Sequence, residues 1–329
     1  MREGKLCLFL AITSHSEVFR AMSIMASVPD KYVIVSEAGR GAHSRIYFSL
    51  PKAQIAFVKV QNRISKASIG FSGLKKSLVV IKVSPNRDLI YREYGILQAV
   101  KLSTAPGASE VRRSFLDVKD SGDFGPFGNE HAFLTLGAID PPITLEDFLL
   151  ECNDKVKLPI PLVYHFFLTL VPALIFLRDE LEWTHNDVKW DNVMVRYNPE
   201  TSPLGLPEFV FIDLGMAYSL KDSKNQSADA KNLLGLVKQM ADRAEGSDDL
   251  DWVGFKRMVD GETSGARSRF DIDKDLVAIL GRWKDATEKG RREKKISETN
   301  MAVAILEIAA QRKGRVTDDD ILDAAAVQI

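Results

Sequence analysis

The chain contains little cysteine, and its formal net charge is close to zero. Its 329 residues include two cysteines, Cys7 and Cys152, and 44 Lys and Arg against 45 Asp and Glu, for a formal net charge of −1. Two cysteines exclude the disulfide framework of small secreted domains. Without a basic excess the chain lacks the electrostatic footprint of a general nucleic-acid binder, so we expect no nucleic-acid partner. With 45% hydrophobic residues it is also too apolar to be disordered.

Long hydrophobic runs are absent as well. The most apolar stretch covers residues 161–177 and is interrupted by His165 and Pro172. A transmembrane helix needs about 20 consecutive apolar residues. We therefore expect no membrane span and predict that residues 161–177 form a buried core helix.

The N-terminus carries only a weak targeting signal. Arg2 and Lys5 precede an apolar run over residues 6–12, which is short for a signal peptide, and no clear cleavage pattern follows. We predict an N-terminal extension over residues 1–28 and a cytoplasmic location. Secretion stays open as the alternative.

The hydrophobic pattern changes near the middle of the chain. Before that point, alternating and β-branched runs predict strands, and one segment with helical spacing predicts a helix. These predictions are strands at residues 32–35, 45–50, 55–60, 78–83 and 131–139, a helix at 88–102 and an irregular insertion at 103–130. From Thr144, a good N-cap residue, helical patterns dominate. We predict an α+β protein with a β-rich domain over residues 29–138 and a helix-rich domain over residues 139–329.

Two segments of the second half carry polar residues that suggest a chemistry. The first, THNDVKWDNVMVR, lies between an apolar helix and a β-branched run, and the second, FVFIDLGMA, is an apolar strand that ends in Asp213. Among the polar residues of the first segment are His185, Asp187, Lys189 and Asn192. The two segments resemble the catalytic loop (H-R-D-L-x-x-x-N) and the D-F-G motif of protein kinases. The resemblance implies a bilobal kinase-like fold, with a small β-rich N-lobe and a larger helical C-lobe, and the cofactors ATP and Mg²⁺.

The resemblance also implies a role for each of these residues. Asp187 would accept the proton of the substrate hydroxyl, Lys189 would contact the transferred phosphate, and Asn192 and Asp213 would hold Mg²⁺. Phosphoryl transfer needs such a set, because negative charge must be neutralised and the attacking oxygen must be held in line. The resemblance covers roughly residues 31–245.

A glycine-containing turn in the first half matches the phosphate-covering loop of the family. The residues concerned are Gly39, Arg40, Gly41 and Ala42, between two predicted strands. Ser44 replaces the third glycine of the family pattern, so close backbone approach is more restricted there.

The strand predicted at residues 131–139 would supply the adenine site. By resemblance, backbone groups of Leu134, Leu136 and Gly137 bind the edge of the adenine ring.

Two lysines compete for the phosphate-binding role. Lys59 lies 20 residues after Gly39, near the usual interval, whereas Lys82 leads directly into the predicted helix that carries Glu93. A lysine in an apolar strand needs a partner, and Glu93 can provide it. This pairing favours Lys82 with Glu93, and Lys59 stays open as the alternative.

The phosphate acceptor is left open by two conflicting features. Asp213 and Asp229 are only 16 positions apart, without an A-P-E motif between them, which favours small-molecule kinases such as aminoglycoside and choline kinases. Lys189 instead favours Ser/Thr protein kinases. We predict transfer of the ATP γ-phosphoryl group to a hydroxyl, preferably of Ser or Thr in a protein. The alternatives are a small-molecule kinase and a nucleotide-binding pseudokinase that acts as a scaffold.

Asp229 itself has two interpretations. By resemblance it braces the catalytic loop, and by position it is a helix N-terminal aspartate that the helix dipole favours.

Overall fold

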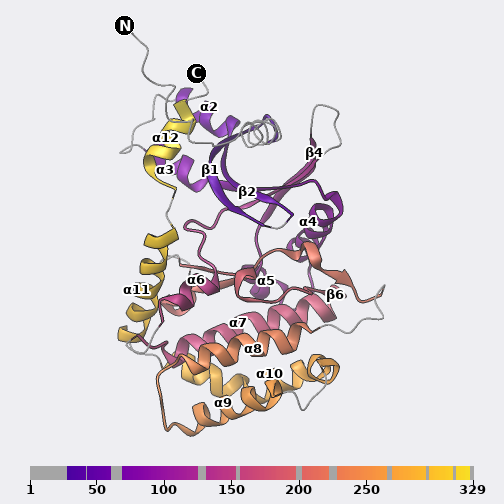
Figure 1. Cartoon of the computed structure of the whole chain (residues 1–329), viewed down its shortest axis with the longest axis vertical. Helices are drawn as coiled ribbons and strands as arrows, with labels where there is room; N and C mark the ends of the chain where they lie inside the picture. The colour runs from indigo at the N-terminus through magenta and orange to yellow at the C-terminus, as the bar shows by residue number, and fades with distance from the viewer. Residues whose placement is uncertain are drawn as a thin grey trace, which may run out of the picture. The chain divides into compact units, whose positions relative to one another are not determined.

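The computed structural model of the chain has a mixed α+β structure. It describes residues 28–41, 43–60, 69–124, 131–152, 156–197, 202–221, 228–264, 269–293, 296–313 and 316–326. Except for its last residue, the predicted extension over residues 1–28 lies outside the described residues. The described residues divide into two compact units (Figure 1). Unit 1 comes from residues 1–90, 120–135 and 318–329, and unit 2 comes from residues 91–119 and 136–317.

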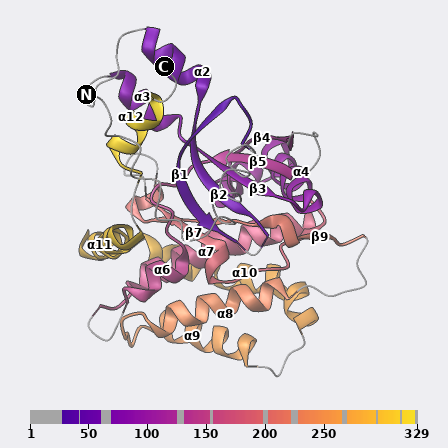
Figure 2. The same cartoon turned by 45° about the horizontal axis from the view of Figure 1, so that its top comes forward.

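Unit 1 contains a five-stranded antiparallel sheet (Figure 2). Its strands are β1 (Tyr32–Arg40), β2 (Arg45–Pro51), β3 (Val79–Ser84), β4 (Val118–Phe124) and β5 (His131–Gly137), in the order β1-β2-β3-β5-β4. The first two residues of β4 and the last two of β5 belong to unit 2. The strands predicted at residues 32–35, 45–50, 78–83 and 131–139 are confirmed, with shifted ends.

One face of this sheet buries an apolar cluster. Val79, Ile81 and Val83 of β3 pack with Tyr47 of β2 and Phe133 of β5. Alternate residues of a strand point to the same face, so every second residue of β3 joins the cluster.

The strand predicted at residues 55–60 is wrong, because this segment belongs to helix α2 (Lys52–Val60). Ile55 and Val58 are both buried, at 1% and 2% exposure. Their spacing of three residues places both on one side of a helix, whereas in a strand they would point to opposite faces. The described part of unit 1 also contains the helices α3 (Ile69–Lys76) and α12 (Asp318–Ala326).

The helix predicted at residues 88–102 is confirmed as α4 (Arg87–Leu102). The irregular insertion predicted at residues 103–130 is wrong over most of its described part. It contains α5 (Ala108–Val111), the 3₁₀ turn η1 (Arg112–Ser114) and strand β4, while residues 125–130 lie outside the described residues. Strand β4 has the sequence VKDSGDF and pairs with β5 at the edge of the sheet. Its lysine, aspartates and glycine are residue types depleted in strands, so the sequence does not indicate one here.

Helices dominate unit 2. Besides α5 and most of α4, the described helices of this unit are α6 (Leu145–Leu150), α7 (Ile160–Asp179), α8 (Asp229–Asp242), α9 (Leu250–Thr263), α10 (Arg269–Arg292) and α11 (Ile296–Lys313). Helix α7 packs against α8 and α10, and α8 packs against α9, as Figure 1 shows. The remaining elements are short: β6 (Trp183–Thr184), η2 (Trp190–Asn192), β7 (Val193–Arg196), η3 (Pro203–Gly205), β8 (Glu208–Phe211), η4 (Leu214–Met216) and β9 (Tyr218–Ser219).

The most apolar helix, α7, is the core of unit 2. By length and composition it would be able to cross a membrane, with a mean hydropathy of 2.1, but 72% of that window is buried inside the structure. Phe166 and Phe167 are fully buried and meet Phe209 and Phe255 edge to face. The predicted buried core helix is confirmed.

Helix α6 begins as its sequence predicts. Thr144 is the N-cap, its side chain accepts a hydrogen bond from the backbone N–H of Asp147, and the Asp147 carboxylate accepts one from the Thr144 N–H. This capping box satisfies two backbone donors that a helix end otherwise leaves open.

Candidate active site

The two kinase-like motifs meet at one end of a small hairpin in unit 2. Strands β7 and β8 pair antiparallel, with Val193 opposite Phe211. The N–H of Ile212 donates to the carbonyl of Asn192 at 3.0 Å. Asn192 therefore lies directly before β7 and Asp213 lies two residues after the end of β8, so the pairing brings the two residues to the same end of the hairpin.

Asp187 lies within hydrogen-bond distance of two neighbours in the loop. Its Oδ2 is 2.6 Å from Asn192 Nδ2 and 2.9 Å from Lys189 Nζ. Asn192 Nδ2 also donates to the Asp187 carbonyl at 2.9 Å. Among the described residues both side-chain contacts reach Oδ2, so Oδ1 of Asp187 is left to accept a proton. Both side-chain hydrogen bonds of Asn192 to Asp187 are donated by its amide nitrogen, so its amide oxygen is left to bind a cation.

Asp213 lies close enough to act on Lys189. The pKa of Lys189 is raised, chiefly by the hydrogen bond to Asp187 and further by the negative charges of Asp187, Asp191 and Asp213. Partial burial of the lysine acts in the opposite direction. The loop lysine therefore senses both carboxylates that the sequence singles out. Asp213 itself has left-handed backbone angles, φ 60° and ψ 61°.

Asp229 joins the first turn of α8 to the catalytic loop. It is buried at 3% exposure, and its carboxylate accepts hydrogen bonds from the backbone N–H groups of His185 at 2.6 Å and Asn186 at 2.9 Å. Of the two interpretations of Asp229, the hydrogen bonds support the brace. Hydrogen bonds from backbone N–H groups to a carboxylate are among the stronger ones in proteins.

His185 and Arg92 each contact the segment that carries Asp213. His185 is fully buried, with its ring 5.3 Å from the ring of Phe211 in β8. Arg92 in α4 donates to the carbonyl of Gly215 at 3.0 Å. Gly215 is the last residue of the DLG segment, Asp213-Leu214-Gly215, which corresponds to the D-F-G motif. Sequence reasoning missed Arg92, since nothing in a surface-type helix pattern distinguishes it from other arginines.

The donor set suits a nucleotide-bound Mg²⁺. Among the described residues no three His, Cys, Asp or Glu side chains cluster to hold a metal ion. The hairpin end instead offers an amide oxygen, from Asn192, and a carboxylate, from Asp213. Mg²⁺ accepts one or two such protein oxygens and completes its shell with water and phosphate oxygens.

The glycine-containing turn differs from its prediction. Gly39 and Arg40 belong to strand β1, opposite Ile46 and Arg45, and only the residues after them turn. The N–H of Gly41 donates to the Ser44 carbonyl at 2.9 Å, and Ala42 lies outside the described residues. A Cβ on Gly41 would come within 3.1 Å of Ser44 Oγ, so this tight turn favours glycine there.

The two candidate lysines have different surroundings. Lys82 is in β3 and 7% exposed, whereas Lys59 lies in the last turn of α2, so the strand position predicted for it is wrong. Glu93 in α4 is 1% exposed. Lys82 belongs to unit 1 and Glu93 to unit 2, and each has interaction partners in the structure. Lys82 is therefore the buried strand lysine that the argument from the sequence requires.

The predicted adenine-binding strand is largely occupied by its own sheet. Leu134 and Leu136 are buried in β5, between β3 and β4. The N–H of Gly137 donates to the carbonyl of Asp117 at 2.7 Å, so this amide is engaged within the protein. A backbone donor for adenine would then have to come from the residues after Gly137, where β5 has ended.

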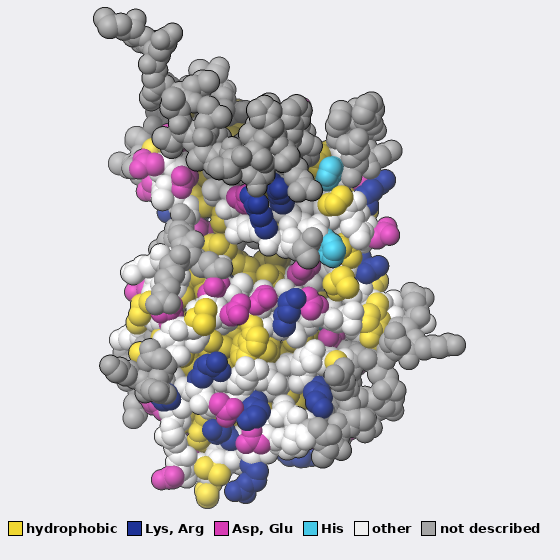
Figure 3. Space-filling view, viewed as in Figure 1, with side chains coloured by type: hydrophobic (Ala, Val, Ile, Leu, Met, Phe, Trp, Pro, Cys, Tyr) yellow, Lys and Arg dark blue, Asp and Glu magenta, His cyan; other side chains and the backbone are white. Residues whose placement is uncertain are grey.

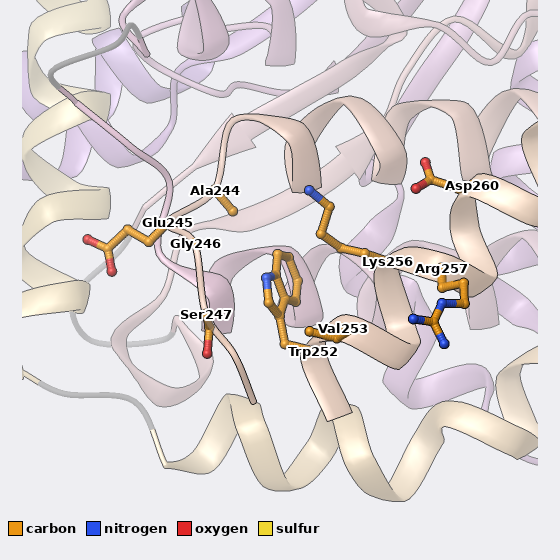
Figure 4. A pocket seen from close by; sticks show the side chains of 9 residues that line it. All are labelled: Ala244, Glu245, Gly246, Ser247, Trp252, Val253, Lys256, Arg257 and Asp260. Carbon is orange, nitrogen blue, oxygen red and sulfur yellow. The ribbon is translucent and has the colours of Figure 1, made fainter. Parts of the chain in front are cut away.

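One hollow of unit 2 lies apart from these motifs. It has a volume of about 360 Å³, between the loop of residues 244–247 and α9. Figure 4 shows Trp252 and Lys256 projecting from α9 there. No residue of the catalytic loop or of the DLG segment lines it.

Comparisons with known proteins bring no assignment. No protein-family model matches the chain, and a search of curated proteins finds no match. The function is therefore argued from the geometry and chemistry of the site itself.

Proposed function

We propose that the chain is an ATP- and Mg²⁺-dependent phosphotransferase of protein kinase-like type that phosphorylates Ser or Thr of a protein. The observation that carries this proposal is the meeting of four residues of two separate segments at one hairpin end. These residues are Asp187, Lys189 and Asn192, joined by the distances given above, and Asp213, which the pairing of β7 with β8 brings to the same end. Their side chains supply a base, a cation and two Mg²⁺ ligands.

The proposal includes the bilobal kinase-like fold. The five-stranded sheet with α4 would form the small lobe, and the helices around α7 would form the large lobe. The mixed α+β composition and the position of the catalytic loop after a buried helix support this interpretation.

In the proposed reaction Asp187 accepts the proton of the attacking hydroxyl. Asn192 Nδ2 and Lys189 Nζ fix its Oδ2, which orients the carboxylate for the hydroxyl. A positioned base of this kind contributes roughly 10²–10⁴ in rate. Lys189 then also lies near the transferred phosphoryl group, where its charge offsets developing negative charge.

Asn192 and Asp213 would hold Mg²⁺ on the nucleotide. When bound, Mg²⁺ neutralises phosphate charge and bridges the phosphate oxygens. Lys82 would contact the phosphates with Glu93 as its partner. The end of β1, with Gly39 and Arg40, and the following Gly41 and Ala42 would cover the phosphates. Leu134 and Leu136 would line the adenine site.

A small-molecule acceptor is the second candidate. The 16 positions between Asp213 and Asp229 leave little chain for a segment that docks a peptide, which supports this alternative. A pseudokinase scaffold would need no base, but Asp187 keeps both of its side-chain contacts.

Two substitutions test the proposed function in the full-length protein. We expect Asp187→Asn to bind Mg²⁺-ATP, measured as a thermal shift, but to transfer phosphate at least about 10²-fold more slowly. Asp213→Ala should lose Mg²⁺-dependent ATP turnover. Asp179→Asn, an exposed carboxylate at the end of α7 paired with Arg178, is the matched control and should behave as the wild type.

The outcomes separate the candidates. Turnover as in the wild type in both site variants would refute the assignment. A wild-type protein that binds Mg²⁺-ATP without turning it over would be a pseudokinase. Labelled ATP offered with protein substrates and with a panel of small hydroxyl compounds would identify the acceptor class.

A further inference from the structure

A second hollow of unit 2 opens beside the catalytic loop. It has a volume of about 370 Å³. Its lining includes Lys189 and Trp190 from the loop, Lys231, Gly235 and Gln239 from α8, and Thr263 from α9. The volume falls within the range of sites that hold small ligands or single side chains of a partner. Asp187 is not among the lining residues, but Lys189 contacts it at 2.9 Å, so an occupant of this hollow would lie one side chain away from the proposed base.

One face of α8 forms the floor of the hollow. Lys231, Gly235 and Gln239 are four residues apart, so they follow one another along the same side of the helix. A Cβ built on Gly235 meets nothing within 4 Å. The missing side chain at this position therefore leaves room for an occupant.

The lining is positively charged. Two lysines, Lys189 and Lys231, line the hollow, and no carboxylate is among its described lining residues. Lys189 is paired with Asp187 and also feels the charge of Asp191. Within the described part of the chain no hydrogen bond or ion pair is made by Lys231. On the face of the molecule shown in Figure 3, by contrast, Lys and Arg are interspersed with Asp and Glu.

The acidic residue Asp260 of α9 is paired with a lysine other than Lys231. Asp260 lies 2.7 Å from Lys238, which also contacts Asp242 at 2.9 Å, on the α8–α9 interface. The charge of Lys231 is thus not neutralised by these neighbours, and it favours an anionic group.

We propose that this hollow binds the phosphate acceptor, and that the acceptor is a Ser- or Thr-containing peptide with acidic side chains beside its hydroxyl residue. The inference rests on the proposed function, because it takes Asp187 as the base. Lys231 attracts the acidic side chain, and Gln239 offers its side-chain amide to the peptide. The Thr263 hydroxyl donates to the Val259 carbonyl and can accept a hydrogen bond from the peptide. The hydroxyl then lies toward Lys189 and Asp187.

A pair of peptides tests the charge preference. We expect the wild type to phosphorylate Glu-Glu-Ser-Glu-Glu with at least about tenfold higher kcat/KM than Lys-Lys-Ser-Lys-Lys at low ionic strength, since salt screens exposed charges. Lys231→Glu should reverse this order. Lys256→Glu, which changes a lysine of the other hollow, should keep it. Equal rates for the two peptides, unchanged in Lys231→Glu, would overturn the proposal.

Filling the hollow gives a second test. Gly235→Leu should fold, because leucine is a better helix former than glycine and its Cβ has space. We expect it to weaken binding of the acidic peptide, measured by calorimetry without nucleotide, by at least about tenfold. Gly281→Leu is the matched control, an open glycine of α10 outside the hollow, and should bind as the wild type. Unchanged affinity in Gly235→Leu would overturn the proposal.

The binding measurement separates this inference from the proposed function. Suppose the wild type binds the acidic peptide, Lys231→Glu and Gly235→Leu do not, and the wild type never turns over ATP. The peptide site in the hollow is then supported and the proposed phosphotransferase activity is refuted. If ATP is turned over and neither α8 variant changes peptide binding or peptide preference, the phosphotransferase stands and the hollow fails. Transfer to glycerol 3-phosphate but to neither peptide would overturn the peptide as the source of the anionic group.

Discussion

At the scale of single residues, Asp229 shows how one buried carboxylate positions a loop that lies 44 residues earlier in the sequence. It accepts the backbone N–H groups of His185 and Asn186, and so it holds the loop directly before Asp187. Asn186 has a left-handed φ of 62°. Such a conformation outside glycine persists when surrounding contacts enforce it, and the Asp229 bonds are those contacts.

Removing this brace should affect both stability and catalysis. We expect Asp229→Ala to lower the free energy of unfolding by about 2–4 kcal/mol, because the buried N–H of His185 loses its acceptor, at roughly 1–3 kcal/mol, and the partly buried N–H of Asn186 loses its acceptor at a smaller cost. The rate of transfer should fall while Mg²⁺-ATP binding is kept. Chemical denaturation and nucleotide titration measure the two effects.

Asp229→Asn separates the brace from a helix-dipole effect. The amide keeps one acceptor, so at least one of the two N–H groups loses its partner, whereas the dipole interaction alone is worth about 0.3–1 kcal/mol. A loss below about 0.5 kcal/mol, with an unchanged transfer rate, would favour the dipole and argue against the brace.

Positive backbone φ angles coincide with the two motifs. Of the four described non-glycine residues with a positive φ, Asn186 lies in the catalytic loop and Asp213 in the DLG segment. Local strain of this kind is often found at functional sites, and it agrees with the functional role proposed for these two segments.

At the scale of elements, helix α7 combines an apolar composition with a buried histidine. His165 is 2% exposed, and its ring lies 6.0 Å from that of Phe209. Burial, together with the positive charge of Arg291, lowers the pKa of His165 from 6.5 to about 3. The native helix thus holds a neutral imidazole where the unfolded chain would bind a proton.

This buried imidazole makes the protein acid-sensitive. The unfolded state takes up a proton below pH 6.5, whereas the folded state takes one up only near pH 3. The contribution of the neutral His165 to the free energy of unfolding is therefore complete above pH 6.5 and is lost as the pH falls toward 3. Lowering the pH from 7 to 5 should cost about 2 kcal/mol of unfolding free energy, at about 1.4 kcal/mol per pH unit below 6.5. Urea denaturation at a series of pH values measures it.

His165→Leu is the variant for this comparison. Leucine has a similar volume and cannot titrate, so the acid-dependent loss between pH 6.5 and 5 should shrink by about 2 kcal/mol, whatever the change in absolute stability. A pH dependence identical to that of the wild type would show that His165 is not the group responsible.

At the scale of the whole molecule, the chain builds unit 1 from both of its ends. Helix α12, from residues 318–326, packs on strand β1, and Lys75 of α3 pairs with Asp318 at 3.2 Å. Ile321 is fully buried in this helix. The last helix of the chain therefore belongs to the same folding unit as the first strand.

A cavity in α12 should loosen unit 1. We expect Ile321→Ala to destabilise unit 1 by about 2–5 kcal/mol, as for other buried large-to-small substitutions. Hydrogen exchange should then increase in β1 and α12 and change little in α8 or α10. Asp323→Ala, exposed on the same helix, is the control and should stay within about 0.5 kcal/mol of the wild type. Increased exchange confined to unit 2 would contradict this assignment of α12.

What could be predicted depends on local signals. The helix α4 and the core helix α7 follow from periodicity and hydrophobicity over 16 and 20 residues, and the start of α6 follows from the Thr144 cap. The spacing of Asp187, Lys189 and Asn192 within a single short loop likewise identifies the candidate site from the amino-acid sequence alone.

The sequence by itself therefore determined most of the local elements and the spacing of the polar residues in the loop of residues 184–192, because both depend on neighbours a few positions away. Only the tertiary structure showed that residues 55–60 are helical, that VKDSGDF is a strand and that the Gly137 amide is taken by Asp117. The same holds for the pairing that brings Asn192 next to Asp213 and for the open face of α8 at Gly235. The Gly137 hydrogen bond and the pairings of β4 and of β7 with β8 depend on a partner outside the segment itself, and neither periodicity nor spacing encodes which partner a backbone group will meet. The helix at residues 55–60 instead follows a local spacing, that of the buried Ile55 and Val58, which the β-branched residues of this segment hide.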